Sequence, residues 1–259
     1  MEFLHDDAFQ IARRFAQAGQ SYDEHAIIQK KIAHTLFDLM QQNSANTVFD
    51  RVLEIGCGSG NLSKVFLEHM MVKTLYLNDL YVEVQQHFDD HSAIEWCIGD
   101  AEKITFPDAL ELFMSSSALQ WMQDLDGILN KSADVLQDQA LICFSTFGQE
   151  NLKEIKALTQ HGLAYLTLTE IQDKVEQAGF EVLHISEQVE ALFFKHPKHV
   201  LEHLKATGVT ATGAKFRWNK QSLAAFYQGY RRFIATDEHE NLVYPLSYHP
   251  IYVIARRMK

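Results

Sequence analysis

The sequence contains few prolines and cysteines and no long apolar run. With four prolines in 259 residues and no low-complexity tract, it shows no obvious flexible linker between domains. The three cysteines, Cys57, Cys97 and Cys143, are scattered without metal-ligand spacing, so we expect reduced thiols, a cytoplasmic location and no metal site. No run of about 18 apolar residues occurs, and the first residues lack a basic region followed by an apolar one. We therefore predict neither a membrane span nor export.

Residues 54–60 read Glu-Ile-Gly-Cys-Gly-Ser-Gly and directly follow the short apolar run 51–53. An apolar strand that ends in an acid and a Gly-x-Gly-x-Gly turn lets the backbone pass close to an adenosine-bearing cofactor, because glycine has no Cβ. The spacing differs from the Gly-x-Gly-x-x-Gly fingerprint, whose loop faces a pyrophosphate, and so favours S-adenosylmethionine over NAD. Taken alone, the segment is also compatible with a tight strand-to-helix turn that binds no ligand.

Two further acids follow apolar runs downstream of this loop. Asp79 comes after the run 74–77, and Asp100 comes after the run 94–98. The carboxyl ends of strands in an open parallel sheet border the binding crevice, and Asp79 stands about 20 residues past the loop, where an acid can accept hydrogen bonds from both ribose hydroxyls. Asp100 and the backbone N–H of Ala101 can meet the adenine edge. Each acid alone is more often an ordinary loop or N-cap residue.

Apolar periodicity predicts an alternation of strands and helices. Helices are expected near 6–18 and 24–42, and strands and helices then alternate at 52–55, 60–69, 74–79, 81–88, 94–98, 110–115, 124–136 and 140–146. Further helices near 149–158 and 169–178 lead to a strand at about 181–194, and a final strand covers 248–255. This order predicts an α/β fold in which crossover helices doubly wind a parallel sheet.

Some fifty residues lie between the last two expected strands, with helical patterns near 197–206 and 220–234. The segment is too long for a simple hairpin and predicts a lid over the cofactor crevice. We accordingly expect a single domain of three parts. They are an N-terminal helical cap (1–45), a core (46–194 and 244–259) and a lid insertion (195–243).

The expected lid carries an uneven charge. Residues 195–232 hold eight Lys or Arg against one acid, a net charge of +7, whereas the whole chain carries −11 and the remainder therefore −18. A basic patch on an acidic protein indicates an anionic partner. We expect no nucleic acid, because the acidic remainder would repel a long polyanion, and a small acidic protein or a phosphate-bearing substrate fits better. A solvated helix face is the alternative. The cations expected to meet the partner are Lys205, Lys215, Arg217, Arg231 and Arg232.

The segment Ser-Ser-Ser-Ala-Leu-Gln-Trp at 115–121 follows another apolar run. The carboxyl end of this expected strand faces the cofactor's methyl group. Ser115 or Ser116 can offer a backbone carbonyl to the cofactor's amino group, and Gln120 and Trp121 can line a pocket beside it. A core aromatic is the alternative for Trp121.

From Val52 to about Phe147 the chain resembles class I S-adenosylmethionine-dependent methyltransferases. The resemblance implies a mostly parallel, seven-stranded, Rossmann-like sheet with N-terminal helices and a helical lid inserted before the last strand. It also implies that the acid before the loop helps hold the methionine portion of the cofactor, the second acid the ribose and the third the adenine. The residues that it assigns to S-adenosyl-L-methionine are Glu54, Gly56, Cys57, Gly58, Gly60, Asp79, Leu80, Asp100, Ala101 and Ser116.

Shorter elements give a narrower resemblance. They are Ser-Tyr-Asp-x-His-Ala at 21–26, Ala-Leu-Gln-Trp at 118–121, Phe-Ser-Thr-Phe-Gly at 144–148, Leu-Lys-Ala-Thr-Gly at 204–208 and Tyr-Pro-Leu-Ser-Tyr-His at 244–249. Together they are similar to the BioC family of malonyl-acyl-carrier-protein O-methyltransferases of biotin synthesis, over nearly the full chain. This resemblance implies methylation of the free carboxyl of a malonyl thioester, carried on the phosphopantetheine arm of acyl-carrier protein, with S-adenosyl-L-homocysteine as product.

The resemblance also implies a mechanism by positioning. Tyr22 matches a tyrosine that borders the transferred methyl, whereas the stretch 163–166 departs from the family because some members carry an arginine there. A malonyl carboxylate is ionised at neutral pH and a sulfonium is already activated, so we expect no general base. Tyr22, Gln120 and Trp121 would then act by orienting the reactants. The alternative for Tyr22 is an aromatic that staples an N-terminal helix.

Two other functions stay open from the sequence. A carboxyl methyltransferase acting on a free small acid, such as a trans-aconitate-type enzyme, has a similar Leu-Gln-Trp element and would not depend on a carrier protein. A non-catalytic module that binds S-adenosylmethionine would serve a partner protein. The complete set of acids and glycines argues against this module.

Overall fold

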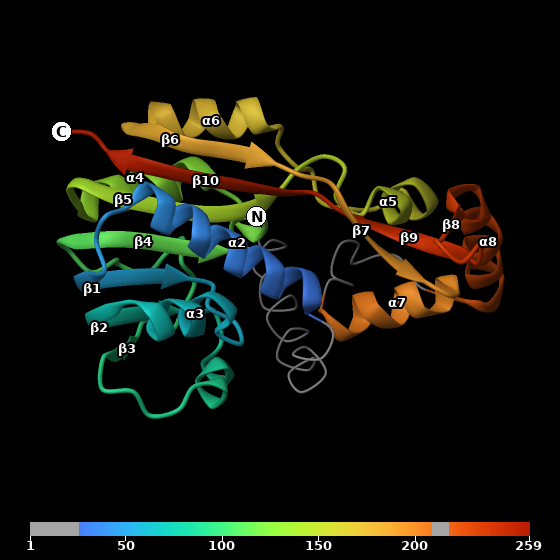
Figure 1. The fold of residues 1–259 in the computed structure, drawn as a ribbon, viewed down its shortest axis with the longest axis horizontal. Helices are drawn as coiled ribbons and strands as arrows, with labels where there is room; N and C mark the ends of the chain where they lie inside the picture. Colours follow the sequence, from blue (N-terminus) through green and yellow to red (C-terminus); the bar gives the residue numbers. More distant parts are fainter. Residues whose placement is uncertain (1–25, 209–217) are drawn as a thin grey trace. The chain divides into compact units, whose positions relative to one another are not determined.

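A seven-stranded sheet lies in the larger of two units, residues 27–147, 166–187 and 250–259. The computed structural model describes residues 26–208 and 218–259, to which every structural statement below refers. The strands lie in the order β3-β2-β1-β4-β5-β10-β6 (Figure 1), and only β10 is antiparallel to its neighbours β5 and β6. Their bounds are Val48–Ile55 (β1), Met71–Asn78 (β2), Ile94–Trp96 (β3), Leu110–Ser116 (β4), Leu136–Phe147 (β5), Phe180–Glu187 (β6) and Pro250–Arg257 (β10). The expected α/β fold with a doubly wound, mostly parallel sheet is confirmed.

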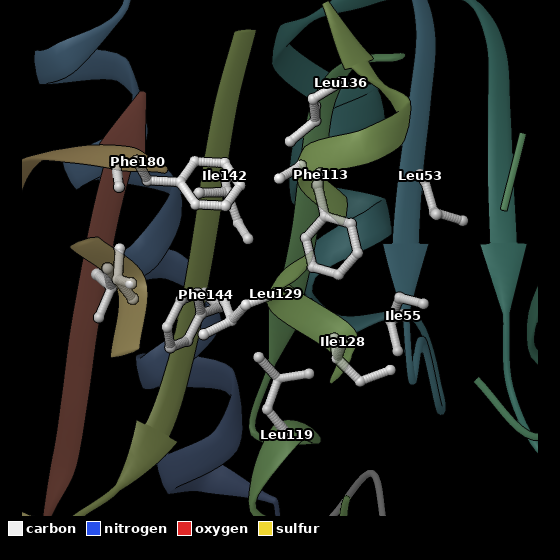
Figure 2. Packing of buried hydrophobic residues seen from close by; sticks show 14 of the residues in the cluster. Leu53, Ile55, Phe113, Leu119, Ile128, Leu129, Leu136, Ile142, Phe144 and Phe180 are labelled. Carbon is white, nitrogen blue, oxygen red and sulfur yellow. The ribbon is translucent and has the colours of Figure 1, made fainter. Parts of the chain in front are cut away.

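Helices pack on both faces of this sheet. Leu53 and Ile55 of β1 lie in one apolar cluster with residues of α4 and α6 (Figure 2). Glu54, between them, bonds instead to Ser63 of α3, because successive side chains of a strand point to opposite faces. The helix bounds are Ile27–Asn43 (α2), Asn61–His69 (α3), Leu125–Val135 (α4) and Leu168–Gln177 (α6). The alternation of side chains thus directs Glu54 to the face of β1 on which α3 lies.

The N-terminal helix of this unit, α2, forms because its apolar residues recur every four positions. Ile32, Leu36 and Met40 are each 1% exposed. This spacing aligns them in one stripe of an amphipathic helix. α2 packs on α3 and on strands β4, β5 and β10, and Figure 1 shows it crossing in front of these strands. Burial of each such side chain stabilises the unit by about 1.5–3 kcal/mol.

The smaller unit contains residues 148–165 and 188–249 and has its own three-stranded antiparallel sheet, in the order β7-β9-β8. The carboxylate of Glu154, 1% exposed, accepts hydrogen bonds from the Oγ and the N–H of Ser247 at 2.6 and 3.0 Å. Segments 148–165 and 188–249 are therefore joined by a buried carboxylate whose two oxygens both accept hydrogen bonds. The bounds are Lys153–Thr159 (α5), Glu190–Phe194 (β7), Pro197–Ala206 (α7), Lys220–Tyr230 (α8), Arg231–Phe233 (η4), Ala235–Thr236 (β8) and Leu242–Tyr248 (β9).

Three expected elements differ from the observed ones. The helix expected at 81–88 is a short 3₁₀ helix, η1 (Val82–His87), which has β-branched valines and no side-chain cap. The strand expected at 181–194 is two strands, β6 and β7, which pair with different partners. The last apolar run likewise splits, because Pro250 has no N–H to extend β9 and begins β10 instead.

Three further expectations concern the N-terminal helix, the division of the chain into parts, and membrane spans. The helix predicted near 6–18 lies outside the described residues. The division into cap, core and lid stays a prediction. Within residues 26–208 and 218–259, no helix combines the length and apolar composition needed to cross a membrane.

Candidate active site

The glycine loop leaves β1 at Ile55 and enters α3 at Asn61. Gly56 and Gly58 have φ angles of +69° and +53°, in the left-handed region that strains other residues. A Cβ on Gly56 would lie 2.4 Å from the Cβ of Ala118, so no side chain fits there without a shift of the segment after β4. A Cβ on Gly58 would meet no described heavy atom within 4 Å. The loop is therefore tightly packed on one side and offers open backbone on another.

Asp79 follows β2 and holds this loop in place. Its Oδ2 accepts a hydrogen bond from the N–H of Gly58 at 2.9 Å, and its Oδ1 accepts one from the N–H of Leu80 at 2.7 Å. Burial raises the pKa of Asp79, and the backbone N–H donors oppose that rise. The structure thus brings the second acid of the sequence pattern directly onto the glycine loop.

Glu54 ends β1 inside the protein, with a residue exposure of 1%. The Oγ of Ser63 donates a hydrogen bond to its Oε2 at 2.5 Å. Burial raises the pKa of Glu54 to about 8; the Ser63 hydrogen bond lowers it, and the nearby Asp79 adds to the rise. Glu54 is therefore mostly neutral at pH 7, and a cation placed beside it would favour its ionised form.

The loop after β3 folds around its own acid. The Oδ1 of Asp100 accepts a hydrogen bond from the N–H of Glu102 at 3.0 Å, and its Oδ2 pairs with the Nζ of Lys103 at 2.6 Å. The N–H of Gly99 donates to the backbone oxygen of Asp79 at 2.9 Å. The second and third acids are therefore neighbours, although the Asp100 carboxylate is already engaged by its own loop.

The end of β4 and the segment after it contain Ser116, Gln120 and Trp121, the remaining expected site residues of the larger unit. The Oγ of Ser116 lies 3.4 Å from the Oγ of Ser145. Gln120 and Trp121 belong to the 3₁₀ helix η2 (Leu119–Trp121), and the Nε2 of Gln120 donates to the backbone oxygen of Ser117 at 2.6 Å. Ser117 itself has a positive φ of 55°, a strained conformation that often marks functional segments.

Three buried polar atoms around the glycine loop and this segment have no hydrogen-bond partner among the described residues. They are the Oγ of Ser59, the Oγ of Ser117 and the Oε1 of Gln120. By contrast, the Oγ of Ser115 donates to the backbone oxygen of Ile55 at 2.9 Å, so it is satisfied within the sheet. Buried polar atoms without a protein partner are normally matched by water or a ligand.

Comparisons with known proteins agree with this geometry. Residues 26–185 match the model of a methyltransferase domain family. Over 249 residues, the chain is 49% identical to a protein of Acinetobacter baylyi named malonyl-[acyl-carrier protein] O-methyltransferase, and the match covers 95% of this chain and 96% of that protein. The chain belongs to the malonyl-[acyl-carrier protein] O-methyltransferase family.

Other relatives extend over the same length. A malonyl-[acyl-carrier protein] O-methyltransferase of Calditerrivibrio nitroreducens is 36% identical over 245 residues, covering 95% of each chain. The solved structure of the YcgJ protein of Bacillus subtilis aligns with a TM-score of 0.57 at 16% identity, covering 87% of this chain and 99% of that one, and this likeness shows the fold alone. As a member of the malonyl-[acyl-carrier protein] O-methyltransferase family, the chain is an O-methyltransferase.

The remaining predicted residues are Tyr22 and the cations expected to meet the partner. Tyr22, Lys215 and Arg217 lie outside the described residues. Lys205 on α7 and Arg231 and Arg232 on η4 are exposed in the smaller unit. The Nη2 of Arg232 donates to the backbone oxygen of Ala157 at 3.0 Å, and its guanidinium lies over the ring of Phe233 at 4.8 Å from the centroid. Arg232 therefore also has a structural contact of its own.

Sequence patterns missed several residues that hold this methyltransferase site together. The Oγ of Ser63 donates a hydrogen bond to the carboxyl group of Glu54. The Nζ of Lys131 on α4 donates to the backbone oxygen of Ala101 at 2.9 Å and to that of Ile104. Neither residue belongs to a sequence motif, and each contacts a residue on another element that only the fold brings close. The sequence offers no signal for Lys131, which is half-buried and lies between Asn130 and Ser132 on α4.

Proposed function

We propose that this chain transfers the methyl group of S-adenosyl-L-methionine to the free carboxylate of a malonyl thioester on acyl-carrier protein, an early step of biotin (pimeloyl) synthesis. The observation that carries the proposal is membership of the family over nearly the whole chain. The cofactor is S-adenosyl-L-methionine, and the product derived from it is S-adenosyl-L-homocysteine.

The described residues fit this cofactor. The open backbone at Gly58 leaves room beside the loop, and the unpartnered Oγ of Ser59 adds a buried polar group to it. The carboxylate of Asp79 accepts the N–H groups of Gly58 and Leu80, and the N–H of Tyr81 also stabilises its charge, which leaves acceptor capacity for a ribose hydroxyl. Glu54 would face the cationic methionine portion. The other residues that we assign to the cofactor are Gly56, Cys57, Gly60, Leu80, Asp100, Ala101 and the backbone carbonyl of Ser116.

The chemistry needs orientation more than proton transfer. When bound, S-adenosylmethionine supplies an activated methyl group on a sulfonium, and the malonyl carboxylate is already an ionised nucleophile at neutral pH. The chain's own contribution is to hold the acceptor oxygen in line and to exclude water while opposite charges neutralise. We assign this positioning to Tyr22, Gln120 and Trp121. The hydrogen bond from Gln120 to the oxygen of Ser117 fixes one end of its amide, and the buried Oε1 is left to accept a bond from a ligand.

The carrier protein is the partner, and its recognition is electrostatic. An acidic carrier protein would be attracted to the basic segment 195–232, whose net charge is +7. We assign its docking to Lys205, Lys215, Arg217, Arg231 and Arg232. We further propose that the enzyme works in the cytoplasm without nucleic acid or membrane partners. Its three cysteines are free thiols, which fits a reducing compartment.

A panel of acceptors tests the substrate class. Formation of S-adenosylhomocysteine is measured with malonyl-carrier protein, acetyl-carrier protein, malonyl-coenzyme A, malonate and trans-aconitate. We expect turnover with malonyl-carrier protein and none with the acetyl form, which lacks the accepting carboxylate. Turnover only with a free acid would favour the small-acid enzyme, and cofactor binding without turnover on any acceptor would favour the non-catalytic module.

A further inference from the structure

Asn78, the last residue of β2, is buried between two loops of the site with an exposure of 2%. Its backbone oxygen accepts hydrogen bonds from the N–H groups of Gly56 and Cys57, at 2.9 and 3.0 Å. The start of the glycine loop is therefore fixed by the main chain of this residue, whatever side chain it carries.

The side chain of Asn78 holds a different segment. Its Nδ2 donates to the backbone oxygens of Cys97 and Gly99, at 2.6 and 2.9 Å. The backbone pairing of β2 with β3 ends at Leu77 and Trp96. Beyond that point, the side-chain amide of Asn78 holds the segment after β3 against the end of β2. A primary amide has two N–H donors on one nitrogen, which is what two carbonyls in this arrangement require.

We infer that Asn78 is a positioning residue that orients the segment Gly99–Ala101 and so sets how strongly the site prefers adenine over other bases. The inference rests on the proposed use of S-adenosylmethionine. Gly99 directly precedes Asp100 and Ala101, the two residues assigned to the adenine edge. Holding the oxygens of Cys97 and Gly99 fixes the peptide planes that lead into Asp100. The next peptide carries the Ala101 N–H, and its oxygen accepts the N–H groups of Lys103 and Ile104 at 2.8 and 2.9 Å, so Asn78 sets the place from which this turn presents the Ala101 N–H.

The two roles of Asn78 can be separated by substitution. Asn78→Ala removes both side-chain donors but keeps the backbone oxygen that receives Gly56 and Cys57. Asn78→Asp keeps the shape and replaces the donor with an oxygen that repels both carbonyls. A matched control is Asn43→Ala at the end of α2, where the Nδ2 donates to the backbone oxygen of Leu39 at 2.8 Å.

The test is the ratio of two affinities in one protein. Calorimetry measures binding of S-adenosylhomocysteine and of S-inosylhomocysteine, in which the exocyclic amino group of adenine is replaced by a carbonyl oxygen. We expect the unaltered chain to prefer the adenosyl ligand. Asn78→Ala should reduce that preference roughly three- to tenfold, which is the effect of losing about one to two hydrogen bonds. Asn78→Asp should lose at least as much, and Asn43→Ala should keep the preference of the unaltered chain.

The ratio separates this role from general destabilisation, which weakens both ligands alike. An unchanged ratio in Asn78→Ala, or no preference in the unaltered chain, overturns the inference. Failure of the unaltered chain to bind S-adenosylhomocysteine at all would instead contradict the proposed function. Should Asn78→Ala not fold, as judged by circular dichroism, Asn78→Ser carries the same test, because its hydroxyl can serve only one of the two carbonyls.

Discussion

Asp79 both holds the glycine loop and, as we propose, binds the ribose of the cofactor. Its carboxylate accepts the backbone N–H groups of Gly58 and Leu80, the N–H of Tyr81 also stabilises its charge, and acceptor capacity remains for a ribose hydroxyl. Its contribution to cofactor binding therefore includes both direct contacts and the shape of the glycine loop.

Substitution of Asp79 should weaken cofactor binding strongly. Asp79→Ala removes a charge-assisted hydrogen bond to the ribose, worth roughly 1.5–3 kcal/mol, so affinity for S-adenosylmethionine should fall at least about tenfold. Calorimetry measures the effect, with Asp38→Asn on the exposed side of α2 as a control that also removes one negative charge. Equal affinity in Asp79→Ala and the unaltered chain would exclude Asp79 from the site.

Glu54 makes the stability of the ligand-free enzyme depend on pH. Its pKa is raised from the usual 4.5 to about 8 by burial, so the folded chain keeps a proton that the unfolded chain releases between these values. Stability should therefore fall as pH rises through this window, by at most about 1.4 kcal/mol per pH unit from this group. Asp79, whose pKa is also raised, contributes with the same sign.

Glu54→Gln isolates the contribution of that one proton. The glutamine cannot ionise, so the free energy of unfolding should decline less between pH 5 and 8 than in the unaltered chain. Urea titrations at several pH values give the two slopes. Parallel slopes would mean that Glu54 is ionised in the folded protein, contrary to the burial argument.

At the scale of elements, Lys131 attaches the loop that follows β3 to α4. The Nζ of Lys131 donates to the oxygens of Ala101 and Ile104 and lies 4.0 Å from the centroid of the Phe106 ring. Burial lowers the pKa of Lys131, with the charge of Asp100 opposing this, as befits a cation held among backbone carbonyls. The helix thus acts as the fixed support for the loop assigned to adenine.

Lys131→Met should loosen that loop while keeping the apolar stem over Phe106. We expect the KM for S-adenosylmethionine to rise about three- to tenfold, with a smaller change in kcat, because the two hydrogen bonds of Lys131 support the loop that binds the cofactor. Steady-state kinetics with varied cofactor measures both constants. The control is Lys174→Met, which removes the 2.7 Å ion pair with Asp126 between α6 and α4. A similar rise in both variants would contradict a specific role for Lys131.

The sequence predicts those site residues that directly follow a strand in the chain. A glycine loop directly after a strand, and acids directly after the next two strands, follow from the order of residues and from the geometry of parallel sheets. Ser63 and Lys131 were not predictable, because their partners Glu54 and Ala101 lie on other elements and no spacing rule connects them. The same limit explains the strand expected at 181–194, where periodicity continues but the pairing partner changes from β10 to β9.

For the whole molecule, the proposed recognition of a carrier protein rests on the distribution of charge. The segment 195–232 is basic, at +7, and the rest of the chain is acidic, at −18. Charges at the edge of an interface mainly affect the encounter rate and its salt dependence. The contact of Arg232 with Ala157 makes that arginine a poor test residue, since its loss would also disturb the smaller unit.

The double variant Lys205→Glu with Arg231→Glu should therefore lower kcat/KM for malonyl-carrier protein by roughly one to two decades, with little effect on a small malonyl thioester. Added salt should reduce turnover of the unaltered enzyme in the same way, because screening acts over about 10 Å at 0.1 M. The control, Lys30→Glu with Lys31→Glu on α2, changes net charge equally. If the double variant and salt both leave carrier-protein turnover unchanged, docking does not use these cations.

The most direct test of the proposed function is the intact mass of malonyl-carrier protein after incubation with the enzyme and S-adenosylmethionine. The account predicts a gain of one methylene unit, which fragmentation places on the distal carboxyl of the malonyl group. It also predicts that acetyl-carrier protein shows no gain. An unchanged malonyl-carrier mass, with the cofactor bound and the protein folded, would contradict the account.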